Sequence, residues 1–329
     1  MKPGKVSQTV YRRSILKQLH RDGYPAMFPP GQEESCYAVL RREGEETISS
    51  SVSLYGNEKD LCVFAMAQAV NHLASRGAEP LGVSIQIMLP DFAYESRLKA
   101  MMASAAEAAG LQGLAILEAG AQSVPGIQTS IVHVTAVGNG RPADLMRSGM
   151  AKPGQEIVLL KWIGLEGTLR MKREKGEELA KRFVPAFLNQ IEVYCPELFS
   201  VRAMKTAAAI GVSAMHQIVD GGILAALWDM AEGAGIGLSV DMRKMSVRQE
   251  TIEMCEYFHL NPYQLTSAGS VLAVTPKGQE LADTLEREGV PAVIIGHTTD
   301  SRERVIYNGS EMRYLDRPAP DELTKLFVQ

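Results

Sequence analysis

The stretch with the clearest chemical potential runs from Met215 to Trp228 and reads Met-His-Gln-Ile-Val-Asp-Gly-Gly-Ile-Leu-Ala-Ala-Leu-Trp. Apolar residues recur at helical spacing after its two glycines, so the pattern predicts a helix that begins near Gly221 and Gly222. Glycines there let a ligand approach the backbone, and the amides and dipole of a helix start favour an anion. Asp220 stands where a side-chain oxygen can cap the first turn. The stretch therefore indicates either a phosphate-binding site at the start of a helix or a capped helix of the core.

The composition is that of a soluble globular protein of 329 residues, with 46% apolar and 22% charged residues. This length favours two domains of about 150 residues each. A net charge of −4 argues against nucleic acid and an anionic membrane as partners, because both attract basic surfaces. No apolar run has the length of a membrane span. The four cysteines are scattered without metal-ligand spacing, which favours a reduced, cytoplasmic setting.

Strand and helix patterns are mixed along both halves of the chain, which predicts an α/β protein. The glycine- and proline-rich segment 138–153 is the expected boundary between a domain at 1–150 and a domain at 151–329. We expect strands at 37–40, 46–54, 81–89, 114–117, 127–138, 157–161, 238–240, 270–274 and 292–297. We expect helices at 11–20, 60–76, 94–109, from about 168, at 204–210, after 221 and at 278–288.

Several motifs resemble, in the same order, those of the superfamily that contains aminoimidazole ribonucleotide (AIR) synthase. Selenophosphate synthetase, thiamine-monophosphate kinase and the hydrogenase maturation factor HypE are other members, and the HypE-like, AIR synthase-related branch is the most similar. The resemblance covers nearly the whole chain. It is carried by Met215–Trp228, Asn71–Pro80, Lys152–Trp162, Gly164–Thr168, Ser267–Val274 and Ile294–Gly296.

The resemblance implies a two-domain PurM-like fold. In this fold the sheet of the N-terminal domain combines with the same sheet of a second subunit to form a dimeric β-barrel. The C-terminal domain is α/β. It also implies a homodimer and a site for ATP and Mg²⁺ or another phosphorylated, nucleotide-like ligand. The residues that it places at such a site are Asn71, His72, Gly164, Glu166, Asp220, Gly221 and Gly222.

The chain departs from the family pattern where carboxylates are expected to hold magnesium. Ser35 takes the place of an acid in the glycine-rich loop, and Ser51-Val52 that of a Thr-Asp strand end. His72 takes the place of Asp in Asn-Asp, and Gln217 that of Asp in the signature. The segment Glu118–Gln122 replaces a Gly-Gly loop with an acidic or histidine ligand. Each change removes a hard oxygen ligand or a charge that phosphoryl transfer needs.

These changes favour a non-catalytic or weakly active dimeric protein that binds a ligand or a partner through a degenerate magnesium–ATP site. The alternative is an active ATP-dependent enzyme of the ligase or kinase type, with a metal site rebuilt from Glu33, Glu34, His72 and Glu118. HypE itself acts through a C-terminal cysteine, whereas this chain has no cysteine after Cys255. The HypE reaction as such is therefore not expected.

Overall fold

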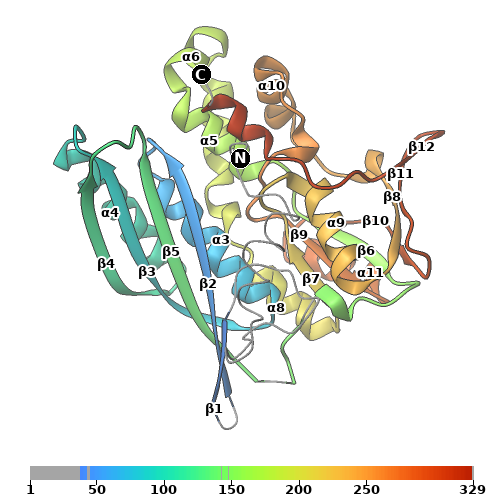
Figure 1. The fold of residues 1–329 in the computed structure, drawn as a ribbon. Helices are drawn as coiled ribbons and strands as arrows, with labels where there is room; N and C mark the ends of the chain where they lie inside the picture. Colours follow the sequence, from blue (N-terminus) through green and yellow to red (C-terminus); the bar gives the residue numbers. More distant parts are fainter. Residues whose placement is uncertain (1–37, 43–44, 142, 147, 328–329) are drawn as a thin grey trace.

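The computed structural model describes residues 38–42, 45–141, 143–146 and 148–327. It contains two β-sheets, one of five strands and one of seven, with helices packed against both (Figure 1). The expected mixed α/β fold is confirmed. Among the described residues, none of the helices is long and apolar enough to cross a membrane.

The first sheet has the strand order β1-β2-β5-β3-β4, and all neighbours are antiparallel except β3 and β4. Side chains of β2 and β5 alternate between a buried face and an open face, as a half-covered sheet requires. Helices α3 and α4 cover the buried face (Figure 1). The elements are β1 (Ala38–Arg42), β2 (Glu45–Gly56), α3 (Leu61–Ser75), β3 (Glu79–Pro90), α4 (Glu95–Leu111), β4 (Ala115–Val124) and β5 (Ser130–Gly140).

The second sheet has the order β12-β11-β8-β10-β6-β9-β7 and is antiparallel except between β8 and β11. The inner strands at Glu156–Leu160 and Val271–Thr275 are mostly apolar because both faces are covered. The elements are β6 (Glu156–Leu160), α5 (Leu165–Glu174), α6 (Gly176–Arg182), α7 (Pro185–Gln190), α8 (Val201–Ile210), β7 (Ala214–Gln217), α9 (Gly222–Ala234), β8 (Gly237–Asp241), α10 (Gln249–Phe258), β9 (Val271–Thr275), α11 (Gly278–Arg287), β10 (Ala292–Thr299), β11 (Arg304–Asn308) and β12 (Glu311–Tyr314).

Helix α3 links the two halves. One side of it packs on β2 and β5, and the other side packs on β7 and α8 of the second half (Figure 1). Thirteen of its fifteen residues are buried, so it is covered nearly all round. Polar residues of α3 that point toward the second half must therefore find partners there.

Three expectations about the elements need correction. The segment Glu118–Gln122 is not a loop, since it lies within the ten-residue strand β4, whose side chains are mostly exposed and give no alternating signal. Strand β7 precedes α9 and was not expected, because four residues are too few to show a period. The helix α4 runs past Gly110 to Leu111 and does not end at the glycine. The helix expected at 11–20 lies outside the described residues.

Candidate functional site

His72 lies in the last turn of α3 and faces β2. Its Nδ1 lies 3.4 Å from the hydroxyl of Ser50. Ser50 is 1% exposed because it shares the covered face of β2 with Ile48. Ser51 and Val52, which take the place of the family's Thr-Asp strand end, lie in the middle of β2, where Val52 packs in the core. The residue that the structure brings to His72 is Ser50.

Glu118 lies on the opposite side of the same sheet. Its Oε1 accepts a bond from Gln86 Nε2 at 3.4 Å, and Gln86 is exposed while its neighbours Ile85 and Ile87 are buried toward the helices. The sheet therefore separates Glu118 from His72. This geometry contradicts the rebuilt metal site that would have used both side chains, while Glu33 and Glu34 lie outside the described residues.

Gln217 ends β7 at the position where the family pattern has an aspartate. It is 2% exposed, and neither polar atom of its side-chain amide has a hydrogen-bond partner among the described residues. Burying an unpaired amide costs about 1–3 kcal/mol. The position thus keeps a polar side chain but lacks the carboxylate that the family pattern has there.

The donors that face each other at Ser50 and His72 do not fit Mg²⁺. No group of three His, Cys, Asp or Glu side chains there could hold a metal ion. Ser50 and His72 offer a hydroxyl and an imidazole, whereas Mg²⁺ takes carboxylates and water. Ser35 lies outside the described ranges with Glu33 and Glu34.

Asn71 is completely buried and fastens α3 to the second half of the chain. Its Nδ2 donates to the carbonyl of Leu198 at 2.7 Å, and its Oδ1 accepts from the amide of Ser200 at 2.9 Å. Both hydrogen-bonding groups of the side chain are therefore used within the protein. Asn71 therefore helps to join the two halves of the chain. Gln68 lies one helical turn before it in α3.

Glu166 lies in the first turn of α5 and is also completely buried. Its carboxylate accepts bonds from Gln68 Nε2 at 2.8 and 2.9 Å, from Thr266 Oγ1 at 2.7 Å and from the amide of Ala268 at 3.2 Å. Gly164, the N-cap residue of α5, has φ of +80° and its amide donates to a serine hydroxyl. These expected ligand-binding residues are brought together, but their polar groups bond to the protein itself.

The charges around Glu166 do not balance. Arg170 Nη1 lies 3.8 Å from Glu166 Oε1, and Arg170 Nε bonds to Glu58 Oε1 at 3.0 Å. One buried guanidinium thus faces two buried carboxylates. Burial is the main cause that raises the pKa of Glu166, while Arg170 opposes the rise.

The start of α9 differs from the expected geometry. Gly221 is the N-cap residue, with φ of +80°, and Asp220 is exposed. The amide of Gly221 donates to the carboxylate of Asp321 at 2.8 Å, one hundred residues further along the chain. The prediction that Asp220 caps the helix is therefore wrong. The anionic group at this helix start belongs to the C-terminal segment.

Four residues of the site were not foreseen from the sequence, namely Ser50, Gln68, Arg170 and Asp321. Ser50 and Gln68 could have been suspected, since each is a polar residue in phase with the apolar face of its element. Arg170 follows Glu166 by one helical turn, a spacing typical of ion pairs. Asp321 carries no local signal, because its partner at Gly221 is remote in sequence.

Comparisons with known proteins agree with this fold. Residues 152–308 match the family model described as AIR synthase related protein, C-terminal domain. The carbamoyl dehydratase HypE of Rhodobacter capsulatus is 26% identical, over 94% of each chain. A putative hydrogenase expression/formation protein of Methanocaldococcus jannaschii is 25% identical, over 98% of this chain and 97% of its own.

Solved structures of the same group superpose over most of the chain. A HypE–HypF complex gives a TM-score of 0.74 at 19% identity and covers 93% of this chain and 100% of that one. HypE in complex with ATP gives 0.71 at 18% identity, with coverage of 98% and 97%. The fold is thus the PurM-like fold of these structures, and the chain is similar to HypE-like members of the AIR synthase-like superfamily.

Proposed function

We propose that the protein is a dimeric, cytoplasmic member of the HypE-like branch that binds a phosphorylated or nucleotide-like ligand, or a partner protein, without magnesium–ATP catalysis. The observation that carries this proposal is the pair Ser50 and His72, because His72 takes the place of an aspartate of the family pattern and the side chain that faces it is a hydroxyl and not a carboxylate. The unpaired amide of Gln217 supports the same reading. A role near hydrogenase maturation is supported by the similarity to a carbamoyl dehydratase HypE and to a putative hydrogenase expression/formation protein.

The relatives also suggest what would bind. One solved structure is a HypE–HypF complex and another is HypE with ATP. We therefore propose a maturation-type partner protein and a nucleotide as the first candidates to test. The division into domains at 1–150 and 151–329 is part of the same proposal, and the two separate sheets support it.

Magnesium-dependent ATP hydrolysis is expected to be absent or very slow. Neutralising phosphate charge is most of what a protein contributes to phosphoryl transfer, and acids that the family pattern uses to hold the cation are replaced in this sequence. The assay is phosphate release with ATP and Mg²⁺ or Mn²⁺, alongside calorimetric titration of ATP with and without metal. Binding of ATP that does not depend on metal, without turnover, supports the proposal.

Robust metal-dependent turnover would instead favour the alternative, an active ATP-dependent enzyme of the ligase or kinase type. The variant Glu33→Gln with Glu34→Gln then tests whether those two side chains supply the ligands. Replacing Ser50 and His72 together by Asp is the matched gain-of-function test, because these two side chains face each other. Val52 is a poor target, since an aspartate there would enter the core.

A homodimer through the first sheet is the second part of the proposal. One face of this sheet is not covered by α3 and α4, and both polar and apolar side chains lie on it. His133 lies at its centre, with Nδ1 2.8 Å from Ser53 Oγ and Nε2 3.3 Å from Thr135 Oγ1. Leu117 on β4 is 57% exposed. An open sheet face with exposed apolar side chains is typical of an interface.

Light scattering at micromolar concentration is expected to give the mass of a dimer. Thr135→Arg should shift the mass to that of a monomer, because a charged long side chain would be buried at the centre of the face. Lys99→Glu, an exposed change on α4 at the covered side, should leave the dimer intact. A monomeric wild-type protein would contradict the proposed interface.

A further inference from the structure

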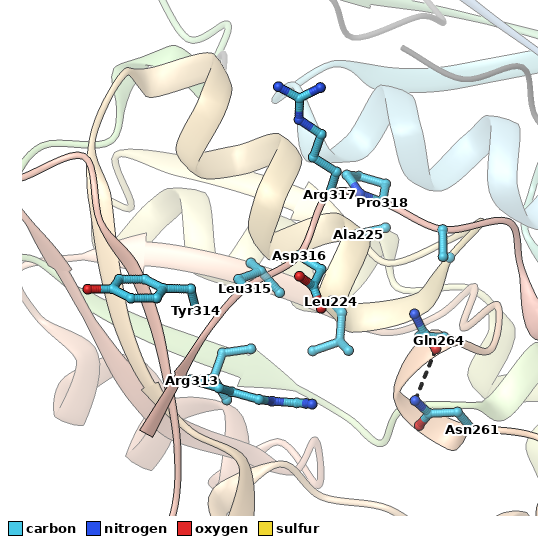
Figure 2. Close-up of a pocket in the computed structure, with 13 residues that line it drawn as sticks. Leu224, Ala225, Asn261, Gln264, Arg313, Tyr314, Leu315, Asp316, Arg317 and Pro318 are labelled. Atoms are coloured by element: carbon cyan, nitrogen blue, oxygen red, sulfur yellow. Dashed lines mark hydrogen bonds between the residues drawn. The ribbon is translucent and has the colours of Figure 1, made fainter. Parts of the chain in front are cut away.

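A cavity of about 160 Å³ lies between the first turn of α9 and the chain that follows β12. Leu224 and Ala225 form its helical wall, and residues 313–319 line it as well (Figure 2). A protein cavity of about 150 Å³ holds one benzene molecule. The cavity beside α9 therefore has room for a compound of about six to eight non-hydrogen atoms.

The backbone at the start of α9 is not available to a ligand of this cavity. Gly221 lies in the cavity wall, but its amide donates to the carboxylate of Asp321 at 2.8 Å. The chemistry of the cavity must therefore come from its side chains.

The side chains of Asn261 and Gln264 hold each other in one orientation at the edge of the cavity. The amide of Tyr263 can only donate, so the Asn261 side-chain atom that it meets at 3.1 Å is the oxygen. Asn261 Nδ2 then donates to Gln264 Oε1 at 3.0 Å. The Nε2 group of Gln264 is left as a hydrogen-bond donor without an acceptor among the described residues.

Arg313 gives the cavity a positive charge that the protein does not neutralise. Its Nη2 lies 3.3 Å from the sulfur of Met242, which is a weak acceptor. Within the described ranges, no carboxylate forms an ion pair with Arg313. Figure 2 shows the guanidinium pointing into the space beside Leu224 and Asn261. Most of its N–H groups are therefore available to a ligand.

Asp316 gives the cavity a negative charge at a separate place. Its carboxylate has no hydrogen bond and no ion pair in the part of the chain that the structure describes. Figure 2 shows this carboxylate near Leu224 and apart from the guanidinium of Arg313. Arg317 extends away from the cavity in the same view. Two opposite charges thus line one cavity without pairing with each other.

The rest of the wall is apolar. Ile306 of β11 is 1% exposed and Leu315 is 6% exposed, and Leu224 adds a third aliphatic side chain. A ligand that suits all these groups has an anionic end, a cationic end and a small apolar part. A phosphate ion would be repelled by Asp316. An uncharged compound would displace water from both charges without replacing its hydrogen bonds.

We propose that this cavity binds a small α-amino acid. The carboxylate of the ligand bonds to Arg313 and to Nε2 of Gln264. Its ammonium group bonds to Asp316, and its side chain lies on the aliphatic wall. This site goes beyond the proposed function, because its ligand is neither phosphorylated nor a nucleotide.

Calorimetric titration of the full-length protein with L-alanine and L-valine tests the proposal. Both amino acids should bind. Propionate and ethylamine each keep only one of the two charged groups, so they should bind at least about tenfold more weakly. This factor is the one expected for the loss of one charge-assisted hydrogen bond.

Two substitutions of exposed residues separate the two charged ends. Arg313→Gln should weaken the binding of alanine by about tenfold and leave that of ethylamine unchanged. Asp316→Asn should weaken the binding of alanine by a similar factor and strengthen that of propionate, since the repelling carboxylate is gone. Arg243→Gln is the matched control and should bind all four compounds as the wild type does. Its guanidinium is also exposed but already bonds to Asp241, and neither residue lines the cavity.

Absence of both heat and a shift in melting temperature with millimolar alanine and valine would overturn the proposal. Equal affinities for alanine and propionate would also overturn it, since the site would then recognise a carboxylate alone. Unchanged affinities in both Arg313→Gln and Asp316→Asn would place the binding elsewhere on the protein and refute the assignment. Titration of ATP is a separate arm. If ATP binds and the amino acids do not, this inference fails while the proposed function stands.

Discussion

Gly222→Ala should lower the free energy of unfolding by about 2–5 kcal/mol. Gly222 has φ of +65°, a region that costs an alanine about 1–2 kcal/mol. An added Cβ would also lie 2.5 Å from the carbonyl oxygen of Tyr263 and 2.8 Å from Cα of Gln264. Both are backbone atoms, so the loop must shift, and overpacking of this kind costs about 1–3 kcal/mol more. Chemical denaturation gives the measurement.

The matched control is Gly235→Ala at the other end of the same helix. Gly235 has φ of +67°, but a Cβ there meets nothing within 4 Å. Its cost should be about 1–2 kcal/mol, from the backbone alone. Equal losses in the two variants would show that the loop yields freely. In that case the Gly-Gly start is not required for packing against residues 263 and 264.

Glu166→Ala should cost about 3–5 kcal/mol, the range for breaking a buried charged network. The change leaves the side chains of Gln68 and Thr266 and the amide of Ala268 without their acceptor at a site with no solvent exposure. Each buried donor without a partner costs about 1–3 kcal/mol. Because these donors come from both halves of the chain, we expect the melting temperature of the whole protein to fall.

Glu166→Gln should cost much less than the alanine change, since its amide oxygen still accepts and the one buried guanidinium, Arg170, then faces the single carboxylate of Glu58. Burial raises the pKa of Glu166, so the wild type should lose stability as the pH rises through that value, and the glutamine variant should show a flatter profile. Glu177→Ala, an exposed change in α6, serves as the control. A loss for Glu166→Ala no larger than for Glu177→Ala would refute the network's role.

The elements that the sequence predicted well are those with a strong period. Helix α3 was expected at 60–76 and spans Leu61–Ser75, and α11 was expected at 278–288 and spans Gly278–Arg287. Strand β4 was expected to be four residues long because its ten residues are mostly exposed, small and without alternation. A period is visible only where one face is buried and the other is not.

The contacts of the site were harder to predict than its elements. The motif around Asn71 and His72 was located correctly, but the residue opposite His72 is Ser50 and not Ser51 or Val52. A shift of one residue in a strand moves the side chain to the other face, so an approximate alignment cannot settle such a pair. The bond between Gly221 and Asp321 joins distant parts of the chain and has no local sequence signature.

The nearly complete burial of α3 has a consequence for synthesis of the protein on the ribosome. The N-terminal half emerges first, and its sheet can shield only one side of α3. The other side stays open to water until the residues of α8 and β7 have been made, more than one hundred positions later. The nascent chain therefore displays an apolar helix face for that interval, and this interval is when chaperones would be needed most.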